Sequence, residues 1–443
     1  MFCSILRRMQ RSLRVGIVGL GTAGLSTSIF LGRLNHKVDI FEATSETDLD
    51  IVVGAGIGVQ PIGLTVLKRL GVLSDILDRG SRIDRLHSTT REGKTVLDLK
   101  YADFRPELHG VGLHRDTLFR SLYDEALLTN GNVQVVPGTK VVNVTRSSHG
   151  SYLEVKGSAE KEGPYDLVVI ADGRDSLRKN MTHVKQYESR YEYGCLWSIL
   201  PDVTGEFTSG EVGRTLHQRL DSAKIMLGLL PTGRTPKMGE DDTTLVSLFW
   251  SLPMSTVDQV KRDGLDRWKE TVVGLEPRTE ALMDGITSFD QLLPAAYSDT
   301  FLPRLYDEQT MTAFVGDCAH ATSPQLGQGA NLALVDAWVL ANAISGCDGN
   351  LVKALHQYDR ERRWRLRFYQ FNSRMLTPVF QSNSTVVGAL RDLLMGPLCQ
   401  FPPTKLQMLT VLCGAQNNGW PWTTIPEEEF MGFTRDKLSH NRH

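Results

Sequence analysis

Three glycines and one carboxylate near the start of the chain have the spacing of a nucleotide site. Gly19, Gly21 and Gly24 form a GxGxxG pattern between a strand-like segment, RVGIVG, and a helix-like segment, LSTSIFLGRL. Glycine at these positions lets the backbone approach a pyrophosphate at the N-terminus of the helix. Glu42 ends the next strand-like segment, where its carboxylate can accept hydrogen bonds from both ribose hydroxyls. We predict a dinucleotide site here, and the carboxylate argues against a 2′-phosphate on that nucleotide.

A second group of candidate residues lies in AFVGDCAHATSPQLGQGANLALVDA, residues 313–337. Asp317 ends an apolar strand-like segment and is suited to binding a polyol hydroxyl. The turn of Gly327, Gln328 and Gly329 opens a helix, whose N-terminal amides stabilise negative charge such as a reduced flavin acquires on its pyrimidine side. An ordinary strand, loop and glycine-started helix is the alternative interpretation of this segment.

Five motifs in a fixed order resemble those of one family. They are the glycine pattern with Glu42, GAGIGVQP at 54–61, Arg115 in RDTLFRSL, Asp172-Gly173 in ADGRDSLRK, and residues 316–336. In these motifs the sequence is similar to the FAD-dependent aromatic hydroxylases, class A flavin monooxygenases with the p-hydroxybenzoate hydroxylase-type fold, including salicylate hydroxylase-like enzymes. The resemblance extends from residue 14 to residue 371 or so.

The resemblance implies FAD as the cofactor and NADH or NADPH as the co-substrate. It implies that Arg115 contacts FAD, that Asp172 and Gly173 lie near the pyrophosphate and support nicotinamide use, and that Asp317 binds the ribityl chain. The loop 324–331 would lie against the isoalloxazine. Taken singly, Asp172 could be a buried structural residue and Arg115 a surface residue. The predicted cofactor-binding residues are Gly19, Gly21, Thr22, Ala23, Gly24, Glu42, Ala43, Gly56, Arg115, Asp172, Gly173, Gly316, Asp317, Pro324, Gly327, Gly329, Ala330 and Asn331.

The resemblance also implies a reaction. NAD(P)H would reduce FAD, O2 would add at the flavin C4a, and the resulting hydroperoxide would hydroxylate a small aromatic or electron-rich organic substrate. A dehydrogenase or reductase of the same fold, without oxygen insertion, is one alternative, and a non-catalytic flavoprotein whose redox state regulates a partner is another. No residue is assigned as a catalytic base.

The sequence departs from the family pattern at several places. DLDIVV stands before GAGIG, where many relatives place an Arg or Glu that reaches the flavin. Ile62-Gly63 replaces a common Asn-Ala. Cys318 stands where the family usually has an alanine, and we expect this cysteine to pack as a small apolar residue. WPWTTIP at 420–426 is similar to a WxWxIP signature of flavin-dependent halogenases, but it has an extra residue and stands at the wrong end of the chain.

The pattern of strands and helices predicts how these motifs are held. Continuous apolar strands alternating with helices indicate a parallel sheet, and the longer alternating strands from about residue 187 indicate a separate antiparallel sheet. We therefore predict an α/β fold with a Rossmann-like FAD-binding domain, an inserted antiparallel-sheet substrate domain and a C-terminal helical tail. The predicted ranges are 1–13 for an N-terminal extension, 14–82, 110–186 and 299–375 for the FAD-binding domain, 83–109 and 187–298 for the substrate domain, and 376–443 for the tail.

The substrate is expected between the flavin and the antiparallel sheet. Five residues on alternating strands offer aromatic or polar groups for such a pocket, although each is as consistent with the core of the sheet. The candidates are Tyr193, Trp197, His217, Met226 and Trp250. We also expect ordinary packing of the segment 375–414 against the main body, with a lid, a dimer face or a lipid contact as alternatives.

Composition excludes several other classes of protein. The 49 basic and 51 acidic residues leave a net charge of −2, which provides no electrostatic footprint for nucleic acid or an anionic membrane. The six cysteines have no zinc-like spacing, which favours free thiols in a reducing cytoplasm. No apolar run reaches the roughly 18 residues of a membrane-spanning helix. We expect a cytoplasmic monomer or homodimer that acts on a small organic molecule and O2, without a metal.

Overall fold

A six-stranded sheet forms the first layer of the fold. This computed structural model describes residues 11–49, 54–239 and 242–416, so WPWTTIP and most of DLDIVV lie outside the described residues. The strand order is β18-β19-β12-β1-β2-β8, parallel except for β18. The strands are β1 (Arg14–Val18), β2 (Lys37–Phe41), β8 (Val133–Val136), β12 (Leu167–Ile170), β18 (Tyr306–Asp307) and β19 (Thr312–Phe314).

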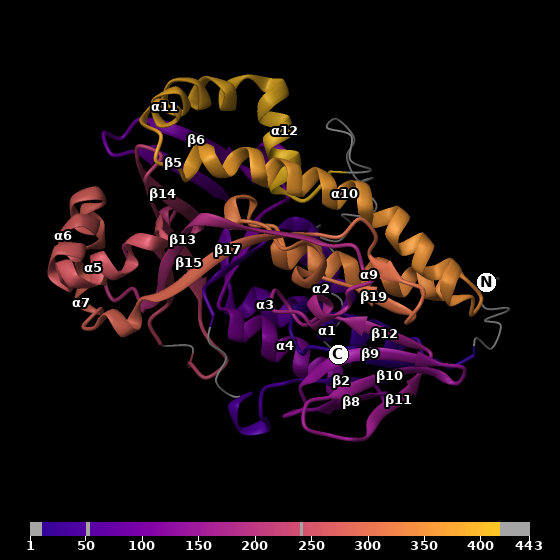
Figure 1. The fold of residues 1–443 in the computed structure, drawn as a ribbon. Helices are drawn as coiled ribbons and strands as arrows, with labels where there is room; N and C mark the ends of the chain where they lie inside the picture. Colours follow the sequence, from indigo (N-terminus) through magenta and orange to yellow (C-terminus); the bar gives the residue numbers. More distant parts are fainter. Residues whose placement is uncertain (1–10, 50–53, 240–241, 417–443) are drawn as a thin grey trace, which may run out of the picture.

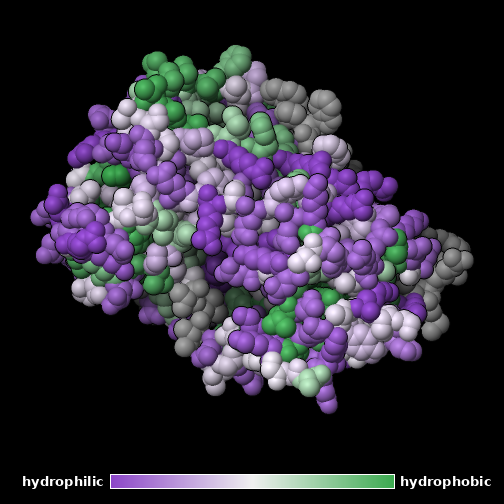
Figure 2. All heavy atoms as spheres, viewed as in Figure 1, coloured by the Kyte–Doolittle hydropathy of each residue, from purple (hydrophilic) through white to green (hydrophobic). Residues whose placement is uncertain are grey.

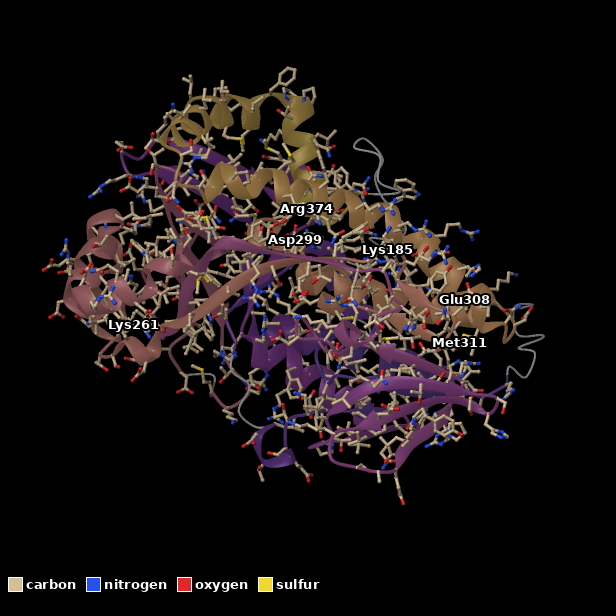
Figure 3. The ribbon with its side chains drawn as sticks, in the orientation of Figure 1. Lys185, Lys261, Asp299, Glu308, Met311 and Arg374 are labelled. Carbon is tan, nitrogen blue, oxygen red and sulfur yellow. The ribbon has the colours of Figure 1, made fainter. Side chains whose placement is uncertain are left out.

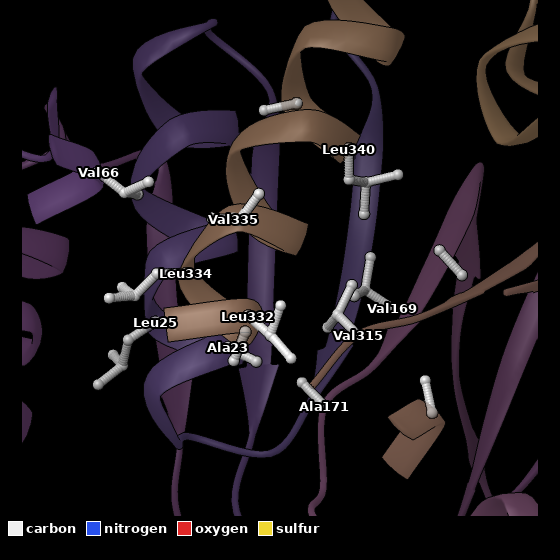
Figure 4. Close-up of a cluster of buried hydrophobic side chains, with 14 of the residues drawn as sticks. Ala23, Leu25, Val66, Val169, Ala171, Val315, Leu332, Leu334, Val335 and Leu340 are labelled. Atoms are coloured by element: carbon white, nitrogen blue, oxygen red, sulfur yellow. The ribbon is translucent and has the colours of Figure 1, made fainter. Parts of the chain in front are cut away.

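Helices cover this sheet, as continuous apolar strands require. Leu332 and Val335 of α9 pack in one core with Ala23 of α1 and with Val169 and Val315 of the sheet layer (Figure 4). The helical segment that starts at residue 61 is interrupted at Gly71, whose φ of +82° favours glycine. The helices of this layer are α1 (Thr22–Arg33), α2 (Pro61–Arg69), α3 (Leu73–Arg79), α4 (Arg115–Leu127), α8 (Asp317–His320) and α9 (Gly329–Gly346).

Two three-stranded sheets flank this layer. One contains the hairpin around residues 148–150, and the other joins the segment after Gly54 to the strand before Arg115. Their strands are β9 (Val141–Ser147), β10 (Gly150–Val155) and β11 (Lys161–Tyr165), and β3 (Ile57–Val59), β4 (Ser81–Ile83) and β7 (Gly110–Leu113). Short 3-10 helices are η1 (Glu46–Asp48), η2 (Tyr101–Asp103), η3 (Leu177–Asn180), η4 (Val212–Arg214), η5 (Met254–Thr256), η6 (Pro277–Thr279), η7 (Phe289–Gln291) and η8 (Pro324–Leu326).

A seven-stranded sheet forms the inserted layer, in the order β17-β13-β16-β15-β14-β5-β6. All its pairings are antiparallel except that of β14 with β5, which is parallel. β17 crosses the predicted domain boundary at 298/299. The strands are β5 (Arg85–Thr90), β6 (Thr95–Lys100), β13 (Tyr187–Pro201), β14 (Thr215–Asp221), β15 (Ile225–Gly233), β16 (Leu245–Pro253) and β17 (Leu293–Phe301).

The two faces of this sheet bury different residues. The outer face packs against α5 (Val257–Asp263), α6 (Leu265–Leu275) and α7 (Glu280–Asp284), and Leu227 belongs to that core. On the inner face, Leu230 and Phe249 pack with the core of the six-stranded sheet and its helices. Side chains alternate between the two faces along each strand, so register decides which residues can face the predicted cofactor site.

Three helices complete the chain: α10 (Leu351–Phe380), α11 (Thr385–Gln400) and α12 (Pro402–Leu412). α10 continues through the predicted boundary at residue 375 and ties the layers together, since Arg374 pairs with Asp299 of β17 at 2.5 Å (Figure 3). α11 and α12 form one extremity of the molecule (Figure 1). Within the described ranges, no helix is both long enough and apolar enough to cross a membrane. The predicted α/β fold with an antiparallel sheet and a C-terminal helical region is confirmed.

Candidate functional site

A cavity of about 830 Å³ lies at the carboxyl ends of β1, β2, β12 and β19. Ligands of open α/β sheets bind at this edge. Most of the predicted cofactor residues line the cavity, although they come from segments far apart in sequence. Those on its wall are Gly19, Gly21, Thr22, Ala23, Glu42, Ala43, Arg115, Asp172, Gly173, Gly316, Asp317, Gly329 and Ala330.

The glycine turn is required by backbone packing at two positions. Gly19 has φ +104°, and a Cβ there would lie 2.5 Å from the carbonyl oxygen of Ala171. A Cβ on Gly24 would lie 2.0 Å from the carbonyl oxygen of Gly19. Gly21 is different, because no protein atom lies within 4 Å of its Cβ position. The first and third glycines therefore hold strand and helix together, and the second leaves free space at the cavity.

Two helices begin at this cavity with N-terminal amide groups that no side chain caps. Gly21 precedes α1 and Gln328 precedes α9, and neither provides a side-chain hydrogen bond. Neither helix has an acidic residue in its first turn. Helix N-termini of this kind carry partial positive charge and bind anions. The cavity can thus accept one negative group at each helix start.

Glu42 is held at the end of β2 by backbone groups. One carboxylate oxygen, Oε2, accepts from Leu20 N at 2.9 Å, and the other, Oε1, accepts from Thr44 N at 2.8 Å. The Thr44 hydroxyl also donates to Oε1 at 2.8 Å. A carboxylate has about four acceptor positions, so these three bonds leave capacity for one hydroxyl donor, on Oε2. The position and remaining capacity of Glu42 fit an adenosine ribose.

Asp172 is buried beside the cavity. Its Oδ2 accepts from Leu177 N at 2.7 Å, whereas its Oδ1 has no hydrogen-bond partner among the described residues. Burial raises the pKa of Asp172, although hydrogen bonds from Ser176 and from backbone amides oppose this shift. Ser176 also caps η3 by accepting from Arg178 N at 3.1 Å. The orphaned oxygen is an acceptor for a ligand donor.

Arg115 supplies positive charge to the same cavity. Its side chain is exposed within the cavity, while the surrounding protein desolvates it and lowers its pKa against the attraction of Asp317. The Arg115 side chain packs against Gly54, where any larger residue would clash, because a Cβ on Gly54 would lie 2.4 Å from Arg115 Cδ. The sequence interpretation did not single out Arg174, whose Nε lies 3.7 Å from Asp317 Oδ2 and whose Nη1 donates to Ala296 O at 2.8 Å. The position of Arg174 directly after the Asp172-Gly173 motif is the sequence feature that could have identified it as a residue of the site.

Five predicted cofactor residues do not line the cavity: Gly24, Gly56, Pro324, Gly327 and Asn331. Asn331 is buried, and its side chain accepts from Gln60 N at 2.8 Å and donates to the carbonyls of Gly58 and Gly327. These bonds hold the loop in place. A Cβ on Gly63 would lie 2.1 Å from Asn331 Oδ1, which explains glycine in place of the common alanine.

Behind the cavity lies a buried charged cluster of His320, Asp336 and Arg362. His320 Nε2 lies 2.5 Å and Arg362 Nε 2.7 Å from the Asp336 carboxylate, which also accepts from Gly316 N at 2.8 Å. Burial alone would raise the pKa of Asp336, but the charges of His320 and Arg362 hold it below its ordinary value. The cluster anchors the Gly316 turn to α9 and α10. Cys318 is buried beside it, as expected for a packing residue.

The five predicted substrate residues do not share one pocket. Trp197 is half-buried on the inner face opposite Phe249, and Met226 packs on the same face against Leu220 and Phe380. Tyr193 is buried, and its hydroxyl donates to Asn383 Oδ1 at 3.0 Å. Only the inner-face members can approach the cofactor cavity.

Trp250 and His217 do not fit the predicted substrate pocket, because both lie on the outer face of the seven-stranded sheet. Trp250 packs edge-on against Trp268 of α6, with ring centroids 6.1 Å apart. His217 lines a second cavity of about 210 Å³ with His87, Glu276 and other residues. Burial is the main cause that lowers the pKa of His217 to about 4, and the nearby charge of Arg278 is the second. Alternation along the strand reverses the face at each residue, and the sequence alone did not fix the register.

The groups around the larger cavity fit FAD. The α1 start suits a pyrophosphate, Glu42 a ribose, and the α9 start with Arg115 suits the pyrimidine side of a flavin. Asp172 Oδ1 adds an unused acceptor. Within the part of the chain that the structure describes, no group of three or more His, Cys, Asp or Glu side chains could hold a metal ion.

Comparison with known proteins agrees with this geometry. The FAD binding domain family matches residues 12–234 and 306–367, well over half the chain, and the chain belongs to this family. It is 27% identical over 362 residues to a probable 2-heptyl-3-hydroxy-4(1H)-quinolone synthase of Rhodococcus erythropolis, covering 78% of this chain and 83% of that protein. It is 26% identical over 402 residues to 3-hydroxybenzoate 6-hydroxylase of Klebsiella oxytoca, covering 87% and 93%.

Among solved structures, the fold is similar to that of 2-methyl-3-hydroxypyridine-5-carboxylic acid oxygenase. The TM-score is 0.71 at 22% identity, and the match covers 90% of this chain and 96% of the other. The predicted family and the predicted FAD cofactor are confirmed. The protein is an FAD-dependent monooxygenase, and thus an oxidoreductase.

Proposed function

We propose that this monooxygenase hydroxylates a small aromatic or heteroaromatic ring that is electron-rich, with NADH or NADPH as the reductant. Two electrons come from the nicotinamide, one oxygen atom of O2 enters a ring C–H bond, and the other leaves as water. Two relatives support this substrate class by name, since one is a hydroxybenzoate hydroxylase and the other a hydroxyquinolone synthase. The dehydrogenase and redox-regulator alternatives gain no comparable support.

The observation that carries the proposal is the junction between the FAD cavity and the inner face of the sheet. Ile57 lines the cavity, and its neighbour Gly56 donates its backbone N–H to Ser247 Oγ of β16 at 3.1 Å. Two residues further along β16, Phe249 lies on the same inner face, opposite Trp197. Both aromatic rings are half-buried. A flat substrate held against them would lie beside the cofactor.

The chain's own groups have three tasks in this reaction. Arg115 and the α9 start would stabilise negative charge on the bound cofactor. Glu42 and Asp317 would accept from its hydroxyls and so fix its orientation. The apolar inner face excludes water from the reacting atoms. FAD, when bound, supplies the electron storage and oxygen chemistry that side chains lack.

We also propose that the enzyme works in the cytoplasm. The five described cysteines are all buried and form no disulfide, as expected for a protein of a reducing compartment.

The direct test uses purified protein loaded with FAD, a panel of phenols, aminophenols and hydroxyquinolines, and 18O2. The proposal predicts substrate-stimulated NAD(P)H consumption and one 18O atom in the product. Anaerobic turnover of the same compounds without oxygen incorporation would instead establish a dehydrogenase or reductase. NADH and NADPH are compared in the same assay by their kcat/KM values.

A further inference from the structure

Seven exposed apolar side chains form a ridge on α11 and α12 that the proposed reaction does not use. Fifteen large hydrophobic side chains are exposed among the described residues, and seven of them fall between residues 386 and 406. Each is 40–66% exposed. The apolar ridge consists of Val386, Leu390, Leu393, Leu394, Leu398, Phe401 and Leu406. Apolar surface concentrated in this way marks an interaction site rather than scattered exposure.

Helical spacing produces the ridge. Leu390, Leu393 and Leu394 lie on one side of α11, whereas Gly388, Arg391 and Cys399 are buried on the other. The buried side of α11 packs closely against the turn before β15, since a Cβ on Gly388 would lie 2.8 Å from Ala223 N. The helix is therefore amphipathic, but its more apolar side faces solvent. Figure 2 shows hydrophobic surface gathered over α11 at the top of the molecule.

The charges within α11 and α12 are neutralised. Arg391 is buried and donates to Asp392 at 2.7 Å, and Lys405 pairs with Asp103 at 2.6 Å. No other acidic or basic residue occurs in these two helices. The ridge can therefore enter an apolar environment without carrying an unpaired charge with it.

Lysines surround the base of the ridge. Lys94 precedes β6 and Lys100 is its last residue, and this strand packs against α11 and α12. Lys224 follows Ala223, whose backbone lies against Gly388 of α11. All three are exposed, and none forms an ion pair with a residue that the structure describes. Two exposed acids lie nearby: Glu92 of the same β5–β6 hairpin, and Glu192, which accepts from Asn383 just before α11 at 2.8 Å. The base of the ridge thus carries a positive balance that the overall charge of −2 conceals.

We propose that the apolar ridge docks onto an anionic lipid bilayer surface, with Lys94, Lys100 and Lys224 facing the headgroups. An apolar helix face flanked by lysines is the pattern of interfacial binding, in which acyl burial and headgroup attraction act together. A second copy of the chain fits less well, because a two-fold interface would bring the same lysines toward each other. Met395 of α11 packs against the inner face of the substrate sheet near Leu220. Docking would therefore place the substrate face about one helix diameter, roughly 10 Å, from the bilayer.

The test is flotation of the FAD-loaded enzyme with vesicles of phosphatidylcholine alone or mixed with phosphatidylglycerol. The wild type should float with the mixed vesicles and less with phosphatidylcholine. The Leu390→Glu/Leu394→Glu variant should lower the bound fraction about tenfold or more with both. The Lys94→Glu/Lys224→Glu variant should lose the preference for phosphatidylglycerol, and salt should weaken wild-type binding.

Matched controls separate lipid docking from general stickiness and misfolding. Leu128→Glu and Val203→Glu change side chains that are 74% and 70% exposed elsewhere, and both should float as the wild type does. Flavin absorbance and melting temperature verify that each variant is folded. A wild type that floats with neither vesicle overturns the proposal. So does a dimer, measured by light scattering, that the Leu390→Glu/Leu394→Glu variant abolishes without any change in flotation.

Discussion

The FAD cavity and the seven-stranded sheet hold their ligands by different means. The cavity relies on backbone groups at strand ends and helix starts, with Gly19 at φ +104° and two uncapped helices. The sheet relies on side chains, and neighbouring residues such as Trp197 and Leu196 face opposite layers. A site built from backbone turns depends on local sequence, whereas a site on a sheet depends on register. Four experiments test this difference.

The largest expected effect separates the two faces of the sheet. Trp250→Ala should lower the free energy of unfolding by about 3–5 kcal/mol, because the ring is buried against Trp268. Trp197→Ala should cost less than half as much, since its ring is only half-buried, but it should raise KM for the substrate. Urea unfolding and steady-state kinetics measure the two effects. Equal stability losses with unchanged KM in Trp197→Ala would contradict the assignment of the faces.

The glycine turn gives the next effect. Gly24→Ala should destabilise the apoprotein by about 3 kcal/mol and prevent FAD binding, because its methyl group would lie 2.0 Å from Gly19 O. Gly21→Ala is the matched control, with no protein atom near its Cβ position. It should keep apoprotein stability within about 1 kcal/mol while weakening FAD binding. Urea unfolding of apoprotein and flavin absorbance distinguish the two, and equal behaviour of the variants would refute the division of roles.

Glu276 on the outer side of the sheet should make stability depend on pH. Burial would raise its pKa, but hydrogen bonds and charge from Arg278 and Arg219 lower it from 4.5 to about 2. A carboxyl whose pKa is lower in the folded than in the unfolded protein stabilises the fold at pH values above its unfolded pKa. This stabilisation is lost as the pH falls toward the folded pKa. Between pH 4.5 and 2 the contribution, on the order of 2–3 kcal/mol, should disappear. Urea unfolding of wild type and Glu276→Gln should therefore differ at neutral pH and converge in acid.

The smallest effect concerns one charge in the cavity. Arg115→Met should weaken FAD binding about tenfold, or about 1.4 kcal/mol, by removing a cation that lies in the cavity. Flavin fluorescence during titration of apoprotein gives the Kd. Arg82→Met removes an exposed arginine paired with Asp84 and should leave the Kd unchanged. An unaltered Kd in Arg115→Met would show that this charge contributes nothing to cofactor binding.

The sequence predicted the cavity better than the sheet. The glycine turn, Glu42, Arg115 and Asp317 each stand in a recognisable local motif, and most predicted cofactor residues line the cavity. Asn331 does not, because its amide is used to hold the loop to Gln60. Arg174 was missed because its partners, Asp317 and Ala296, lie more than a hundred residues away. A local sequence pattern does not reveal contacts between residues that are so far apart in the chain.

The sequence by itself determined the α/β class, the order of the motifs and the FAD turn. Each of these depends on short-range sterics, on helix starts or on the period of apolar residues, all of which act within a few residues of the chain. Only the tertiary structure decided that Trp197 faces the cofactor layer while Trp250 and His217 face away. It also decided that the leucines of α11 lie outside rather than in the core. Register and the docking of a helix depend on partners distant in sequence, and one strand or helix does not specify them alone.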